Sequence, residues 1–88
     1  HLSITHGDAH VWNFLLPRPG VRDSVRIFDC DLWSVNVPTG DLAYMMAMHW
    51  YPHGRQAMER ALLNHYHAEL TACGVSGYSR GALDQDYR

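Results

Sequence analysis

Apolar and polar positions divide the chain into a strand-rich first part and a helical second part. Residues 12–16 and 25–28 are apolar at nearly every position, and between them lies the breaker Pro17-Arg18-Pro19-Gly20. Two short apolar runs separated by such a breaker predict a β-hairpin. Because neither run alternates apolar with polar residues, we expect both faces of the hairpin to be covered. Residues 2–4 form a short apolar entry, either a strand or the end of a helix.

Residues 31–40 show no period and are predicted to be irregular. A first helix is expected from residue 41 to about residue 50, with Thr39 as a plausible N-cap and residues 52–54 (Pro-His-Gly) as its breaker. Its apolar residues extend most of the way around the helix, which is typical of a buried helix.

A second, amphipathic helix is expected from about residue 55 to residue 73, ended by Gly74 as its C-cap. Its predicted apolar side is lined by Met58, Ala61, Leu62, His65 or Tyr66, Leu70 and Cys73, and its polar side by Glu59, Arg60, Asn64 and Glu69. Ser79 can cap a third helix that runs through Tyr87.

The predicted fold class is α+β, with a hairpin followed by about three helices. A chain of 88 residues supports one small domain, and we divide it into residues 1–31 and a helical part at residues 39–88. A domain of this size buries roughly 60–65% of its unfolded surface, so its stability is marginal. The chain begins without Met and ends inside a helical pattern. We therefore expect a single partial domain, a segment of a longer protein.

Composition and charge exclude several classes of protein. The net charge is −2, and the seven Lys and Arg residues are scattered along the sequence, which predicts no nucleic-acid or membrane partner. The longest apolar run, residues 42–48, is too short to span a bilayer, and the N-terminus does not resemble a signal peptide. Cys30 and Cys73 fall in no metal-binding or redox spacing, which favours buried free thiols and a reducing, cytoplasmic compartment.

The candidate chemistry lies at residues 6–13, His-Gly-Asp-Ala-His-Val-Trp-Asn, and at Asp29, sixteen residues after Asn13. Phosphoryl transfer from a nucleotide needs a group that orients the acceptor hydroxyl, together with Mg²⁺ on the phosphates. Magnesium prefers hard oxygen ligands such as carboxylate and amide oxygens. Asp8, Asn13 and Asp29 supply these groups, and the hairpin is expected to bring Asp29 back beside Asn13.

The series H-G-D-x-x-x-x-N, hairpin, apolar-apolar-Asp, G-D-L-A resembles the aminoglycoside phosphotransferase and choline kinase-like families, which share the protein-kinase-like fold. The resemblance is strong from His6 to about Tyr44 and implies part of a kinase-like C-terminal lobe. It implies a small-molecule kinase that uses Mg²⁺ and ATP or GTP, and a hydroxyl acceptor.

The resemblance also assigns roles to individual residues. It makes Asp8 the catalytic base or acceptor-orienting carboxylate and makes Asn13 and Asp29 the Mg²⁺ ligands. Leu15 and Phe28 would line the adenine side of the nucleotide pocket. Two further residues have structural roles: Asp41 would brace the catalytic loop through backbone N–H groups, and His6 would fix the loop by packing.

Some expected elements of a kinase are absent from these residues. The chain has no Gly-rich phosphate loop and no strand Lys with a partner Glu, so the 88 residues alone are not expected to be a competent kinase. Asp31 stands where many relatives have Glu, which leaves its role open. The acidic residues of the site would tolerate a cationic acceptor, such as an aminoglycoside or amino alcohol.

Two other functions stay open at this point. His6, Asp8 and His10 form H-x-D-x-H, which could be part of the zinc or transition-metal site of a hydrolase. Alternatively, the segment is non-catalytic and associates with itself through its apolar strands and first helix. This second alternative predicts a dimer or larger oligomer.

Overall fold

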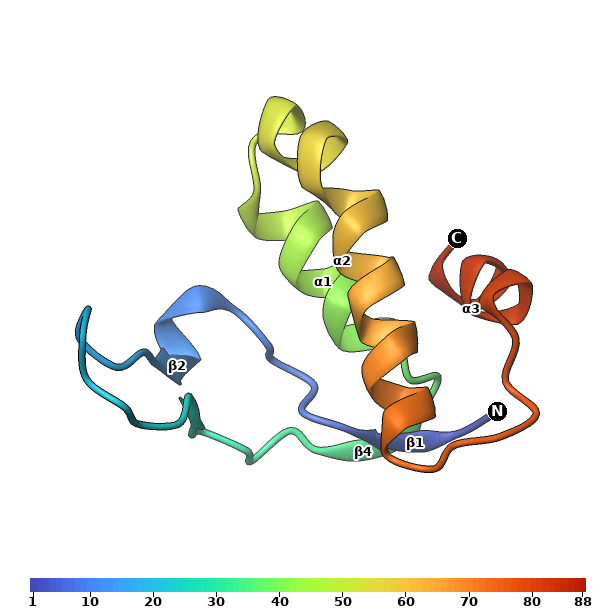
Figure 1. Cartoon of the computed structure of the whole chain (residues 1–88), viewed down its shortest axis with the longest axis horizontal. Coiled ribbons are helices and arrows are strands. Elements are labelled where there is room, and N and C mark those ends of the chain that lie inside the picture. Colours follow the sequence, from blue (N-terminus) through green and yellow to red (C-terminus); the bar gives the residue numbers. More distant parts are fainter.

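The computed structural model describes all residues, 1–88, and confirms the predicted α+β class (Figure 1). Short strands and a 3₁₀ turn occupy the first part of the chain, and helices occupy the second. In chain order the elements are β1 (Ser3–Thr5), η1 (Val11–Asn13), β2 (Phe14–Leu15), β3 (Arg26–Ile27), β4 (Ser34–Asn36), α1 (Gly40–His49), α2 (Pro52–Ala72) and α3 (Arg80–Tyr87). None of the helices is both long enough and apolar enough to cross a membrane.

Two small antiparallel sheets position the candidate loop. β2 pairs with β3 in the predicted hairpin, with Phe14 opposite Ile27. β1 pairs with β4, with Ile4 opposite Val35. The prediction of irregular structure at residues 31–40 was wrong for β4, because a three-residue strand is too short to show a period and is specified by its long-range pairing with β1.

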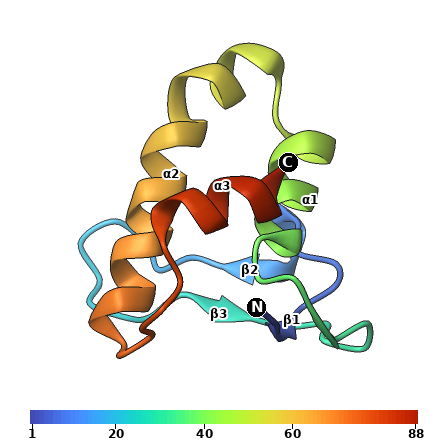
Figure 2. The same cartoon turned by 90° about the vertical axis from the view of Figure 1, so that its right-hand side faces the viewer.

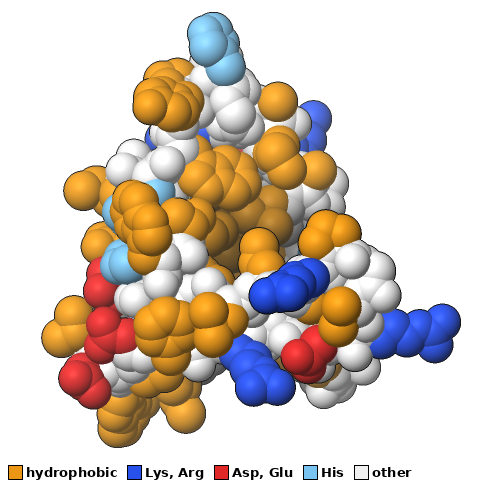
Figure 3. Space-filling view, turned by 90° about the vertical axis from the view of Figure 1, so that its left-hand side faces the viewer, with side chains coloured by type: hydrophobic (Ala, Val, Ile, Leu, Met, Phe, Trp, Pro, Cys, Tyr) orange, Lys and Arg blue, Asp and Glu red, His pale blue; other side chains and the backbone are white.

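The hairpin is shorter and more exposed than predicted. The first strand was predicted at residues 12–16, but residues 12 and 13 belong to η1 and β2 has only the two residues Phe14 and Leu15. Large apolar side chains on both strands remain exposed, including Leu15 at 57% and Ile27 at 54%. Figure 3 shows hydrophobic side chains spread over the face of the molecule on which the hairpin lies. The expected cover on both faces is therefore not supplied by these 88 residues.

The first helix begins close to its predicted start, but the expected cap is not formed. Thr39 is the N-cap residue of α1 yet has helical backbone angles, φ −82° and ψ −3°, and its side chain makes no capping hydrogen bond. In this conformation the Thr39 hydroxyl is turned into the protein, where it is buried without a partner. The helix is also less buried than predicted, since Met46 is inaccessible to solvent whereas Met48 is 69% exposed.

The second helix starts earlier than predicted, and both of the remaining predicted caps are confirmed. Pro52 occupies the first turn of α2, where its missing N–H costs nothing, so it begins this helix. Gly74 has φ +91°, and the Val75 N–H donates to the Leu70 carbonyl across 3.0 Å, which together form a Schellman cap. The Ser79 hydroxyl accepts from the Ala82 N–H at 3.1 Å and caps α3.

The core lies between the three helices (Figure 2) and is small. Its buried apolar residues are Met46, Leu63, Tyr78 and Leu83. The inward face of α2 agrees with the predicted one at Leu62, Tyr66 and Leu70, which pack against this core, and differs from it at residues 58, 59 and 63. Leu63 is 4% exposed, whereas Met58 is 57% exposed and Glu59, assigned to the polar side, is half-buried. The packing of α1 and α3 against α2 determines which face of α2 is buried, and the periodicity of the α2 sequence gives no information about that packing. Cys30 and Cys73 are free thiols, but both are exposed rather than buried.

Candidate functional site

The loop that carries Asp8 makes a turn that requires glycine. Gly7 has φ +85°, a backbone conformation that L side chains rarely adopt. A Cβ atom at this position would also lie 2.2 Å from the Leu32 carbonyl oxygen. The residue between His6 and Asp8 is therefore glycine for two independent reasons, backbone conformation and close backbone approach.

Asp41, in the first turn of α1, holds this loop by its backbone. Its Oδ2 accepts from the His6 N–H at 2.6 Å, and its Oδ1 accepts from the Gly7 N–H at 2.9 Å. Each carboxylate oxygen thus binds one of two successive amides, and hydrogen bonds to a charged acceptor are the stronger kind. The bracing role that the resemblance implied for Asp41 is confirmed.

The His6 ring connects the loop to the end of the hairpin. Its Nδ1 accepts from the Asp8 N–H at 3.2 Å, and its Nε2 lies 2.9 Å from the Phe28 carbonyl oxygen. An amide N–H can only donate and a carbonyl can only accept, so the ring must be neutral with its proton on Nε2. His6 therefore fixes the loop, as expected.

The Asp8 carboxylate is held on both oxygens. The Tyr44 hydroxyl donates to Oδ1 at 2.9 Å. The Asn13 side-chain amide lies 3.4 Å from Oδ2, and so does Nε2 of His10. The hydrogen bond from Tyr44, with smaller contributions from His10 and Asn13, lowers the pKa of the Asp8 carboxyl below its ordinary value despite some desolvation. Asp8 is therefore ionised and oriented at neutral pH.

Tyr44 is the site residue that the sequence analysis missed. Its hydrogen bond to Asp8 is also the main reason why the pKa of the Tyr44 hydroxyl is raised. Asp41 and Tyr44 are three residues apart in α1, so they share one face of the helix. That spacing was visible in the sequence, but nothing there showed that this face meets the loop.

Asn13 is buried at the end of η1 and uses its side-chain nitrogen within the loop. Nδ2 donates to the Asp8 carbonyl at 3.0 Å, in addition to its contact with the carboxylate. Nδ2 also lies 3.3 Å from Nε2 of His10. These contacts leave the amide oxygen without a hydrogen-bond partner. Asn13 can therefore offer a hard oxygen ligand while its nitrogen stays hydrogen-bonded to the loop that carries Asp8.

Asp29 follows directly after the point where the hairpin meets the loop. The Phe28 N–H donates to the Asn13 carbonyl at 3.1 Å, so the hairpin does bring residue 29 to the same end as Asn13. Asp29 is exposed and has φ +60°, the only non-glycine residue with positive φ. Such a conformation is uncommon outside glycine and often marks a functional position. An amide oxygen and a carboxylate at one end of the hairpin suit Mg²⁺.

The alternative H-x-D-x-H metal site is contradicted by the geometry. No group of three or more His, Cys, Asp and Glu side chains in the chain is placed to hold a metal ion. Both ring nitrogens of His6 are already engaged by backbone groups. His10 contacts Asp8 but otherwise packs against the rings of Trp12 and His49, with centroid distances of 5.7 and 5.3 Å.

The residues assigned to the nucleotide pocket, Leu15 and Phe28, are both exposed, and only Leu15 lines the cleft beside the hairpin loop. Leu15 lines a cleft of about 210 Å³ beside the hairpin loop, whereas Phe28, 44% exposed, is not among the residues that line it. Their role toward adenine stays a prediction. Asp31 is exposed and makes no hydrogen bond, so the structure gives it no role.

Comparison with known proteins agrees with this site and narrows the resemblance. Residues 1–75 match the ecdysteroid kinase-like family, which covers the loop, the hairpin, α1 and α2. No curated protein and no solved structure matches the chain. The match is to a kinase-like family related to phosphotransferases, so the aminoglycoside phosphotransferase and choline kinase-like families were too specific an assignment. The chain belongs to the ecdysteroid kinase-like family.

Proposed function

We propose that this chain carries the acceptor-orienting and metal-binding half of a small-molecule phosphotransferase site. The reaction is transfer of the γ-phosphate of ATP or GTP to a hydroxyl group. The observation that carries the proposal is the Asp8 carboxylate, which Tyr44 and Asn13 hold in a loop that Asp41 braces. Membership of a kinase-like family supports it independently.

In this proposal each side chain has one task. Asp8 accepts a hydrogen bond from the acceptor hydroxyl and orients it toward the γ-phosphate. It takes the hydroxyl proton as the new P–O bond forms and the bond between the γ-phosphorus and the departing nucleoside diphosphate breaks. Because its pKa is low, Asp8 acts mainly by orientation and accepts the proton late. The Asn13 amide oxygen and the Asp29 carboxylate would hold Mg²⁺, which neutralises charge on the phosphates when bound. Leu15 and Phe28 would contact the adenine ring.

The wider context of the site is also a proposal. We expect the nucleotide to be covered by a lobe with a Gly-rich loop and a strand Lys, which these residues do not contain. The family name makes a hydroxyl of an ecdysteroid the first acceptor to test, ahead of a cationic one. We also expect a reducing, cytoplasmic compartment, in which exposed thiols such as Cys30 and Cys73 would stay free.

The test is made in the protein that contains these residues, with nucleotide binding and turnover measured separately. Asp8→Ala should reduce turnover by two or more orders of magnitude, a typical effect of losing a general base, and leave nucleotide affinity nearly unchanged. Asp31→Ala, which removes an exposed carboxylate without contacts, is the matched control. Turnover within a few-fold of wild type for Asp8→Ala would show that the assignment of the base is wrong.

A further inference from the structure

The fold gathers most of the chain's cationic residues into one place. Arg55, Arg60, Arg80 and Arg88 all line a cleft of about 500 Å³ between α2 and α3. The whole chain has only seven Lys and Arg and a net charge of −2. In the sequence these four residues are scattered, and only the fold brings them to one cleft.

The charges in this cleft are not balanced. Only two side-chain carboxylates, Glu59 and Asp84, line it against four guanidinium groups, so its side chains carry two excess positive charges. Arg55 pairs with Glu59 at 3.1 Å, and Arg80 pairs with Asp84, each across one helical turn. Arg60 and Arg88 have no carboxylate partner. Two paired arginines would be ordinary helix-surface ion pairs, but the two unpaired ones leave a local excess of positive charge.

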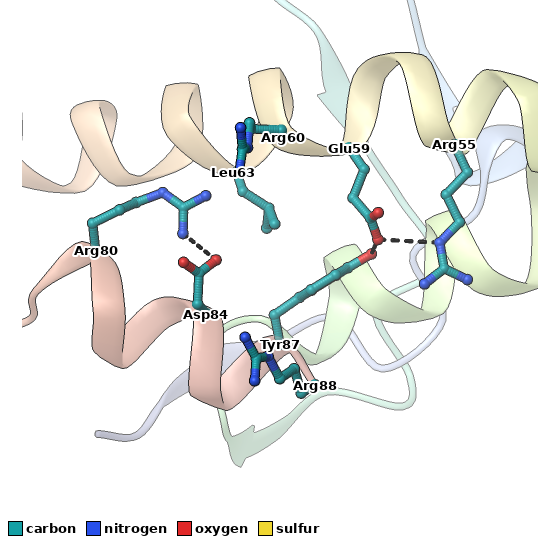
Figure 4. Close-up of a pocket in the computed structure, with 8 residues that line it drawn as sticks. All are labelled: Arg55, Glu59, Arg60, Leu63, Arg80, Asp84, Tyr87 and Arg88. Carbon is teal, nitrogen blue, oxygen red and sulfur yellow. Dashed lines mark hydrogen bonds and ion pairs between the residues drawn. The ribbon is translucent and has the colours of Figure 1, made fainter.

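Several of the lining groups are held in place. Nε of Arg80 donates to the Asn64 side chain at 2.8 Å while its terminal nitrogen binds Asp84, so the plane of this guanidinium is fixed from two sides. On the opposite side the Tyr87 hydroxyl donates to Glu59, which also accepts from Arg55. Figure 4 shows Arg80 and Asp84 on one side of the cleft and Arg55, Glu59 and Tyr87 on the other.

We infer that this cleft binds a small phosphorylated molecule. Guanidinium groups match phosphate oxygens in geometry and charge and bind them with paired hydrogen bonds. The volume lies within the roughly 300–1,000 Å³ of small-molecule sites, and Leu63 and Tyr87 provide apolar surface for the non-phosphate part. Glu59 and Asp84 would repel a continuous polyanion, which favours a small ligand over nucleic acid. This inference does not depend on the phosphotransfer proposal, because none of its residues belongs to that site.

Inorganic pyrophosphate, without divalent metal, is the probe for this site. A chemical-shift titration of the 88-residue chain should show saturable shifts at residues 55–63 and 80–88. Arg60→Gln, which removes a side chain that makes no hydrogen bond, should weaken binding about tenfold, the expected loss of one hydrogen bond to a charged group. Arg60→Lys should restore part of the affinity, because lysine restores the positive charge but not the planar guanidinium group that can form paired hydrogen bonds with phosphate.

Arg22→Gln is the matched control, because Arg22 is an exposed arginine in the hairpin loop, outside the cleft, and makes no ion pair. It should leave the affinity unchanged. Equal weakening by Arg22→Gln and Arg60→Gln would overturn the inference, because it would show non-specific attraction. Shifts confined to residues 6–13, or none at millimolar pyrophosphate, would also overturn it.

Discussion

The Tyr44 hydroxyl donates a hydrogen bond to Oδ1 of Asp8 across 2.9 Å and so connects α1 to the carboxylate of the candidate site. One helical turn earlier, Asp41 binds the backbone of the same loop. A single face of α1 therefore determines both the path of the loop and the orientation of its carboxylate. The first two predictions separate these two functions of the helix.

Tyr44→Phe should raise the pKa of the Asp8 carboxyl toward its ordinary value of 3.8, because it removes the largest cause of the lowered pKa. In the wild type this interaction stabilises the fold above pH 3.8, and the stabilisation is lost as the pH falls through the lower folded pKa. Carboxyl carbon NMR of Asp8 during an acid titration measures the change. Tyr51→Phe, at a residue that is 87% exposed, is the control. An unchanged Asp8 pKa in Tyr44→Phe would contradict the assigned hydrogen bond.

Asp41→Asn should loosen the loop, because only one of the two backbone amides can then be bound by an oxygen and the charge is lost. We expect a loss of about 1–2 kcal/mol in the free energy of unfolding, and faster hydrogen exchange at the His6 and Gly7 amides. Urea unfolding and amide exchange give the two measurements. Asp31→Asn removes an exposed carboxylate without hydrogen bonds and should change neither. If the His6 and Gly7 amides of Asp41→Asn exchange as slowly as those of the wild type, Asp41 does not brace the loop.

Stability should fall at high pH through Tyr87. Burial and its hydrogen bond to Glu59 raise the pKa of Tyr87 to about 12. A raised pKa stabilises the fold fully below the unfolded value of 10, and this stabilisation is lost as the pH rises through about 12. Buried Tyr78 shifts in the same direction. Urea midpoints between pH 8 and 12 should fall less steeply for Tyr87→Phe. Identical slopes for the variant and the wild type would disprove the linkage.

The exposed hairpin should cause self-association of the 88-residue chain. On the hairpin the side chains of Leu15, Leu16 and Ile27 are all more than half exposed. Large exposed apolar patches of this kind commonly mark interaction surfaces. Light scattering at micromolar concentration should therefore show a dimer or larger species. Ile27→Glu should shift it toward monomer, while Met58→Glu, at a similarly exposed position on α2, should not. A monodisperse wild-type monomer would contradict this prediction.

Features that depend on neighbouring residues were predictable from the sequence. The Gly74 and Ser79 caps and the hairpin rest on short-range chemistry. The Asp41 brace joins residues more than thirty positions apart, and it was predictable only from the family resemblance. Asp8, Asn13 and Asp29 were named from the same motif, and their roles stay a proposal. The structure adds how Asp8 and Asn13 are held.

Features that depend on distant contacts were not predictable. β4 exists because β1 pairs with it, and Glu59 turns inward because Tyr87 donates to its carboxylate. Tyr44 enters the site only because α1 packs against the loop. The arginine cleft likewise needs α3 to fold back beside α2. None of these partners is near in sequence, so periodicity and propensity carried no signal for them.

The most direct test of the central claim is the location of metal binding in the 88-residue chain. Mn²⁺ accepts the same oxygen ligands as Mg²⁺ and broadens nearby NMR signals. We expect sub-stoichiometric Mn²⁺ to broaden the Asn13 side-chain amide and the Asp29 backbone amide first, and Asp29→Asn to abolish this effect. Broadening that is uniform over the acidic residues, or that survives in Asp29→Asn, would contradict the assignment of these residues as the metal half of a phosphotransfer site.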